Sequence, residues 1–169
     1  MYVHTLEPHE PYTPPEPYAS LYVEAGQEPT DMDLYDAEIA QADAHFKAFI
    51  SMLNELEVYN DTMIILIADH GQAFGEHGVH GHKGKPHHEL LHVPLIVHFP
   101  AALPAGRVIE QNVQLIDIAP TITDVVGIAT PEQFQGASLI PLIMGRDTSA
   151  FEGRNIYASS NAGFSVIKD

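Results

Sequence analysis

The sequence TMIILIADHG, at Thr62–Gly71, decides the fold. From Met63 to Ala68 it is apolar without alternation, which is typical of a strand covered on both faces, as in a parallel sheet. Asp69, His70 and Gly71 follow directly. Ligands of an open parallel sheet bind beyond the carboxyl ends of its strands. These three residues are therefore the first to consider for function.

Elements of alternating type surround this strand. Residues 7–30 are rich in proline and glutamate, which predicts a loop. From Asp31 to about Tyr59 apolar residues recur at three- and four-residue steps, which predicts a long amphipathic helix. Its expected apolar face consists of Ile39, Ala42, Phe46, Phe49, Ile50, Leu53 and Leu56.

Further elements are predicted after residue 90. A second apolar strand is expected at 93–100, and Asp117 is expected to cap a helix that ends near Gly127. A short helix at 138–144 and a strand at 155–158 complete the pattern. Such alternation indicates an α/β fold with a mostly parallel sheet flanked by helices.

Composition excludes some functions. The chain has 169 residues, no cysteine and a formal net charge of -16, so thiolate metal sites are absent and a nucleic-acid partner is not expected. No apolar run is long enough for a membrane span, and no signal peptide is recognised at the start of the chain. Secreted, periplasmic and cytoplasmic locations all stay open, as does the oligomeric state.

The residues after the first strand favour a metal and anion site. Asp69 and His70 offer one oxygen and one nitrogen ligand to a divalent cation. The alternative is structural, with Asp69 capping the next turn and His70 merely polar. The following glycine- and histidine-rich loop contains Lys83 and Lys85, which can bind sulfuryl or phosphoryl oxygens. A second alternative for this loop is a zinc cluster of His77, His80 and His82.

Several segments, in order, resemble the second half of the sulfatase catalytic domain of the alkaline phosphatase superfamily. The resemblance covers about residues 2–145. It is carried by the segments 4–12, 35–39, 69–78, 93–97, 116–121 and 136–139, together with Lys83 and Glu89. It implies an alkaline-phosphatase-like α/β fold, with residues 1–150 as the C-terminal part of the catalytic domain and 151–169 as the start of a smaller subdomain.

The resemblance also implies roles for individual residues. Asp69 and His70 would be metal ligands, with calcium the expected cation and manganese or magnesium the alternatives. His9 would contact the ester and protonate the leaving oxygen. Lys83 would bind the sulfate or phosphate oxygens, with Lys85 as the alternative. The implied partner is a small-molecule or glycan sulfate ester.

The sequence also departs from the family pattern. Sulfatases attack with a formylglycine made from a Cys/Ser-x-Pro-x-Arg motif, and no such motif occurs in residues 1–169. The early pair of aspartates that completes the metal site is missing too. We therefore expect a fragment, truncated at both ends, that lacks the nucleophile.

Three functions are compatible with these observations. The first is a metal-dependent sulfuric ester hydrolase. The second is a phosphonate or phosphodiester hydrolase of the same superfamily, which the Asp69-His70 pair permits. The third is a catalytically inactive α/β domain that binds anions.

Overall fold

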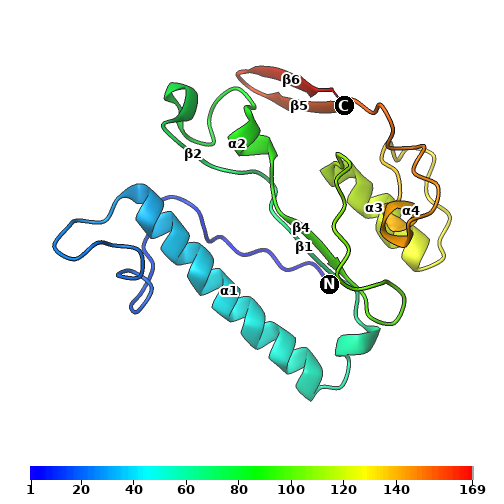
Figure 1. Ribbon diagram of the computed structural model, residues 1–169, viewed down its shortest axis with the longest axis horizontal. Helices are drawn as coiled ribbons and strands as arrows, with labels where there is room; N and C mark the ends of the chain where they lie inside the picture. The colour runs from blue at the N-terminus through cyan, green and yellow to red at the C-terminus, as the bar shows by residue number, and fades with distance from the viewer. Residues whose placement is uncertain (169) are drawn as a thin grey trace. The chain divides into compact units, whose positions relative to one another are not determined.

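The computed structural model describes residues 1–168, which form two compact units. The first unit comprises residues 1–60 and 74–81, and the second comprises residues 61–73 and the chain from residue 82 onward. The long helix α1 (Asp31–Glu55) belongs to the first unit. The second unit contains the strands β1 (Ile64–Ile67) and β4 (Leu95–His98), shown in Figure 1.

The remaining elements are short. Three 3₁₀ turns occur at Tyr59–Asp61, Glu76–Gly78 and Leu115–Asp117. The other helices are α2 (His88–Leu91), α3 (Ile118–Val125) and α4 (Ile140–Met144). The other strands are β2 (Ala73–Phe74), β3 (His80–Gly81), β5 (Ile156–Ser160) and β6 (Gly163–Ile167).

Helix α1 begins where the sequence predicts and is held by a reciprocal cap. The Asp33 amide donates to the Thr30 hydroxyl oxygen, and the Thr30 amide donates to the Asp33 carboxylate. The bonds from Thr30 lower the pKa of Asp33. The cap therefore stabilises α1 above the ordinary aspartate pKa and weakens as the pH falls through the lowered value.

The predicted apolar face of α1 is only partly correct. Leu53 is buried, but Ile39 is exposed, and the other buried positions are Ala37 and Glu38. Glu38 faces inward because its carboxylate accepts a hydrogen bond of 2.7 Å from the Thr13 amide. The spacing of apolar residues predicts which apolar side chains are buried. It cannot predict a buried carboxylate whose hydrogen-bond partner lies elsewhere in the chain.

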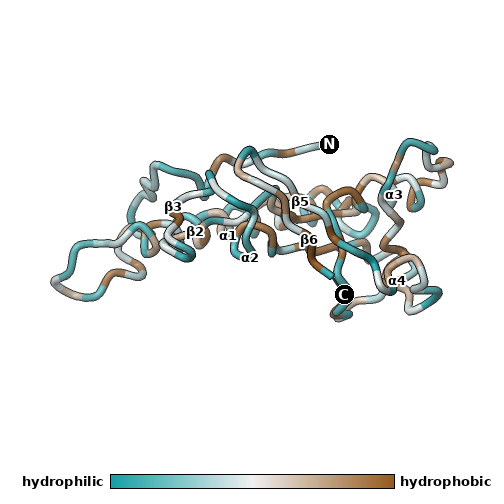
Figure 2. The backbone as a smooth tube through the Cα atoms, turned by 90° about the horizontal axis from the view of Figure 1, so that it is seen from above, coloured by the Kyte–Doolittle hydropathy of each residue, from teal (hydrophilic) through white to brown (hydrophobic). Residues whose placement is uncertain are grey.

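The loop before α1 contains no helix or strand among its described residues, as predicted. Figure 2 shows this loop as mostly hydrophilic, with only short hydrophobic stretches. Tyr12 is its buried anchor. The Tyr12 and Tyr35 rings meet edge to face at 5.7 Å, and Tyr35 and Phe74 do so at 5.1 Å. Burial raises the pKa of the Tyr35 hydroxyl, with a smaller contribution from Asp36.

The α/β class is confirmed, but the pairing of the two apolar strands differs from that of the mostly parallel sheet expected. β1 and β4 pair antiparallel, with Ile64 opposite His98 and Ile67 opposite Leu95. A parallel pair needs a crossover that carries the chain back along the strand. The connection between β1 and β4 contains β2, a 3₁₀ turn, β3 and the four-residue helix α2, and none of these is a long helix of the kind that usually joins parallel strands.

The core of the second unit lies around α4. Leu139, Leu142 and Phe151 are buried against one another, and partly buried side chains from β4, α3 and neighbouring loops pack on them. Phe151 and the following residues thus belong to the same compact unit as α3 and α4. The predicted domain boundary after residue 150 stays a prediction.

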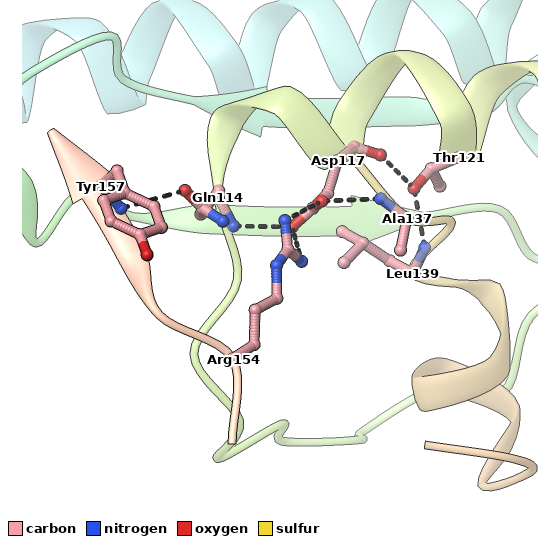
Figure 3. A network of polar contacts seen from close by, with 7 residues as sticks. All are labelled: Gln114, Asp117, Thr121, Ala137, Leu139, Arg154 and Tyr157. Carbon is pink, nitrogen blue, oxygen red and sulfur yellow. Dashed lines mark hydrogen bonds and ion pairs between the residues drawn. The ribbon is translucent and has the colours of Figure 1, made fainter. Parts of the chain in front are cut away.

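Asp117 does not cap α3 with its side chain, contrary to the prediction. It is fully buried, and its carboxylate forms a two-pronged ion pair with Arg154 at 2.8 and 2.9 Å. It also accepts the Gln114 and Ala137 amides, and its own carbonyl accepts the Thr121 hydroxyl (Figure 3). Asp117 therefore joins three separate segments rather than one helix end.

No helix among residues 1–168 is both long and apolar enough to cross a membrane.

Candidate active site

Asp69 and His70 lie side by side just beyond the carboxyl end of β1. The Asp69 Oδ1 and His70 Nε2 atoms are 3.9 Å apart. The His70 amide donates to the same carboxylate oxygen at 3.0 Å, which fixes the side chain of Asp69 against the backbone. The side chain of Asp69 is 74% exposed and that of His70 is 39% exposed, so an ion from solvent can reach both. The structure thus brings together the two predicted metal ligands.

A hydrogen bond fixes the orientation of the His70 ring. Its Nδ1 lies 2.8 Å from the Gly71 carbonyl oxygen, and an acceptor there requires the proton on Nδ1. In the neutral ring, Nε2 then carries the lone pair that a metal needs. Metal-binding histidines commonly donate their other ring N–H to a backbone carbonyl, as Nδ1 does here. His70 Nε2 and Asp69 Oδ1 are therefore suitable donor atoms for a divalent cation.

Gly71 holds this turn against α2. Its amide donates to the Leu90 carbonyl at 2.9 Å. A Cβ atom at position 71 would lie 2.0 Å from the Glu89 carbonyl oxygen, so only glycine fits so close to α2. The absence of a side chain at position 71 therefore permits close packing of the turn against α2.

The lysine-bearing segment starts beside His70. The rings of His70 and His82 are stacked, with centroids 4.4 Å apart. Lys83 follows His82 directly, and both Lys83 and Lys85 are exposed while Pro86 is buried. The segment that contains the predicted anion-binding lysines is therefore adjacent to the predicted metal ligands within the second unit.

His9 belongs to the first unit and is exposed. Its Nδ1 lies 2.7 Å from the Glu10 carbonyl oxygen. The predicted contact of His9 with the ester stays a prediction. Sequence reasoning overlooked Glu38 here, although the Thr13 amide bonds to it and so ties the segment around His9 to α1. An acidic residue inside an amphipathic helix was the only sequence signal for this contact.

Hydrogen bonds hold the carboxylate of Glu76 at the start of the 76–81 turn. The Phe74 amide donates to it at 2.6 Å, and this bond and the one from the Glu76 amide lower the pKa of Glu76, with smaller contributions from His80 and His77. Within residues 1–168 no three histidine, aspartate or glutamate side chains are arranged to hold a metal ion. The structure thus offers no support for the alternative zinc cluster of His77, His80 and His82.

A small open pocket of about 190 Å³ lies elsewhere in the second unit. It is lined by Phe99, Ala102, Leu103, Asp124, Val125, Ile140, Met144 and Arg146. None of the predicted site residues lines it, and it lacks the histidines and lysines that the predicted chemistry requires. We therefore place the candidate site at the end of β1.

Comparison with known proteins identifies the family. A family model described as Sulfatase matches residues 1–128. The chain belongs to the sulfatase family. All five predicted site residues of this sulfatase domain, His9, Asp69, His70, Lys83 and Lys85, fall within the matched range.

Individual sulfatases show the same relationship. The chain is 35% identical to human Arylsulfatase K over 108 residues, which are 64% of this chain and 20% of that protein. It is 31% identical to the N-acetylglucosamine-6-O-sulfatase of Bacteroides thetaiotaomicron over 109 residues, 64% of this chain and 19% of that protein. The sulfatase chain described here thus spans about a fifth of the length of these relatives.

Solved structures of the superfamily confirm the fold. A phosphonate monoester hydrolase from Silicibacter pomeroyi superposes with a TM-score of 0.69 and 31% identity, over 79% of this chain and 27% of that one. A putative sulfatase from Bacteroides fragilis superposes with a TM-score of 0.76 and 19% identity, over 91% of this chain and 38% of that one. The sulfatase chain therefore has the alkaline-phosphatase-like α/β fold predicted from its sequence.

Proposed function

We propose that this chain supplies the metal-ligand and anion-binding part of a sulfuric ester hydrolase whose nucleophile lies outside residues 1–169. The observation that carries the proposal is the pairing of Asp69 and His70, 3.9 Å apart at the end of β1. The stacking of His82 on His70 then leads directly to Lys83. Membership of the sulfatase family supports the reaction class.

The donor atoms of Asp69 and His70 fit a divalent cation. The Asp69 carboxylate and the His70 imidazole would hold such an ion, because carboxylate oxygens and imidazole nitrogens are ordinary ligands of divalent cations and the two atoms lie 3.9 Å apart. Calcium prefers about six to eight oxygen ligands, whereas magnesium and manganese prefer octahedral sites, in which magnesium usually keeps several waters. When bound, the cation would polarise an ester oxygen. Two ligands alone hold it weakly.

The remaining residues then have distinct tasks. The ammonium group of Lys83, or of Lys85 as the alternative, would neutralise the sulfuryl oxygens while the bond from sulfur to the ester oxygen breaks. His9 would give a proton to that departing oxygen. Small-molecule or glycan sulfate esters are the proposed substrates, and the relative that is named for N-acetylglucosamine-6-O-sulfate supports this class.

A phosphonate or phosphodiester hydrolase is the second candidate. Histidine at position 70 permits it, and the similarity to the phosphonate monoester hydrolase from Silicibacter pomeroyi favours it. Both candidates use the same metal ligands and lysines. They differ in the nucleophile, and residues 1–169 contain no Cys/Ser-x-Pro-x-Arg motif.

Manganese tests the proposed metal ligands without requiring turnover. We expect paramagnetic Mn²⁺ to broaden the NMR signals of His70, Gly71 and His82 first, with millimolar affinity. Asp69→Asn should weaken this broadening at least tenfold, because it removes one charged ligand of two. Asp61→Asn, the same change at an exposed aspartate of the second unit, should have no effect. Broadening centred elsewhere, or unchanged by Asp69→Asn, would refute the metal site.

Turnover tests the absence of a nucleophile. We expect the purified 169-residue chain to hydrolyse an aryl sulfate and an aryl phosphonate monoester no faster than buffer containing the same Ca²⁺ or Mn²⁺. The reason is that electrostatic groups lower the barrier but cannot replace the attacking atom. Turnover above this background that is lost in Lys83→Met would show that the chain contains its own nucleophile.

A further inference from the structure

Two serine hydroxyls of the β5–β6 hairpin bond to the lysine-bearing segment. β5 and β6 pair antiparallel from Ile156 opposite Ile167 to Ser160 opposite Gly163. The Ser160 hydroxyl donates to the Gly84 carbonyl at 2.7 Å, and the Ser165 hydroxyl donates to the Pro86 carbonyl. The two accepting carbonyls lie immediately before and after Lys85 in the chain. Figure 1 shows this hairpin in the part of the second unit that also contains α2.

The geometry fixes the main chain but leaves the lysine side chains accessible. Lys83 and Lys85 are exposed, Gly84 is partly buried and Pro86 is buried. A Cβ atom at Gly163 would lie 3.7 Å from Lys85 Cγ, so the stem of Lys85 runs past the tight turn of the hairpin. The His87 amide donates to the Lys85 carbonyl at 2.8 Å, which continues the ordered backbone toward α2.

The base of the hairpin is itself anchored. Arg154 lies two residues before the start of β5 and pairs with the buried carboxylate of Asp117, as Figure 3 shows. Phe151, which lies just before Arg154 in the chain, is buried against Leu139 and Leu142. A continuous series of contacts therefore runs from the core around α3 and α4 through Arg154 and β5 to the carbonyls beside Lys85.

We propose that the β5–β6 hairpin positions Lys83 and Lys85 for anion binding. Ser160 and Ser165 are positioning residues, because they touch the backbone that carries the lysines. A lysine side chain has several rotatable bonds, so a fixed backbone confines its ammonium group to a smaller volume. Such confinement before binding increases affinity for the anion. The inference rests on the anion-binding role proposed above for these two lysines.

Backbone order in the segment 83–87 gives a direct test. In the unaltered chain we expect ¹⁵N order parameters of about 0.8 for Gly84, Lys85 and His87, which are typical of rigid backbone. In Ser160→Ala/Ser165→Ala they should fall below about 0.6. In Ser165→Thr, with Ser160 intact, the order parameters should stay near those of the unaltered chain, because threonine keeps the hydroxyl. Ser159→Ala, the same change at an exposed neighbour on β5, should leave them unchanged.

Titration with inorganic sulfate at low ionic strength separates the hairpin from the lysines. We expect the double alanine variant to bind sulfate about tenfold more weakly, whereas Lys83→Met should weaken binding without altering the order parameters. Unchanged order parameters in the double variant would overturn the inference. Failure of the unaltered chain to bind sulfate would instead contradict the proposed role of Lys83 and Lys85, and the order parameters would still decide whether the hairpin fixes this segment.

Discussion

Replacing Arg154 with methionine lowers the free energy of unfolding by about 3 to 5 kcal/mol, because it leaves a buried charge without its partner. Asp117 is fully buried, and Arg154 supplies two hydrogen bonds and the only opposite charge that bonds to it among the described residues. Domains are commonly stable by only about 5 to 15 kcal/mol. The variant should therefore unfold at a much lower urea concentration, as measured by far-UV circular dichroism.

Two further variants separate the ion pair from general effects of losing an arginine. Arg107→Met removes the same group from an exposed position and should change the stability by less than about 0.5 kcal/mol. Asp117→Asn/Arg154→Met should cost less than the sum of the single changes, because residues in direct contact couple. If Arg154→Met were as stable as Arg107→Met, the buried pair would not be holding α3 and β5 together.

Replacing Gly71 with alanine should destabilise the chain by about 3 kcal/mol and abolish manganese binding at Asp69 and His70. The added Cβ would lie 2.0 Å from the Glu89 carbonyl oxygen, and this obstacle is backbone rather than a movable side chain. Overpacking of this kind costs about 1 to 3 kcal/mol, and the lost bond from the Gly71 amide to Leu90 adds about 1 kcal/mol. Urea unfolding and Mn²⁺-induced NMR broadening measure the two effects.

Gly127→Ala serves as the matched control. Gly127 has a φ of 69° and open space around its Cα, so alanine there meets only the strain of a left-handed backbone, about 1 to 2 kcal/mol. Its manganese binding should match that of the unaltered chain. Normal manganese binding by Gly71→Ala would mean that the close approach to α2 does not position the ligands.

Local sequence signals predicted the elements of the fold well. The three- and four-residue apolar spacing after Asp31 and the apolar run before Asp69 depend on neighbouring residues, so α1 and β1 appear where the sequence places them. The pairing direction of β1 and β4 depends on how the connecting chain travels in space. An apolar strand covered on both faces reads alike in a parallel and an antiparallel pair, so the sequence could not distinguish the two.

The candidate site was predictable to the extent that its residues are adjacent in the chain. Asp69, His70 and Gly71 follow one strand, and their mutual geometry is set by that strand end. The supporting contacts were not predictable, because their partners are distant in sequence. Arg154 meets Asp117 across 37 positions, and Ser165 meets Pro86 across 79. No local period or motif links such pairs.

The antiparallel pairing of β1 and β4 also affects how the site can tolerate variation. Ile67 lies opposite Leu95, so the two ends of the chain that connects β1 to β4 are one inter-strand spacing apart. The entropy cost of closing a loop grows only slowly with its length. Residues inserted between the two strands need not shift their register, so this connection can lengthen while Asp69 and His70 keep their place.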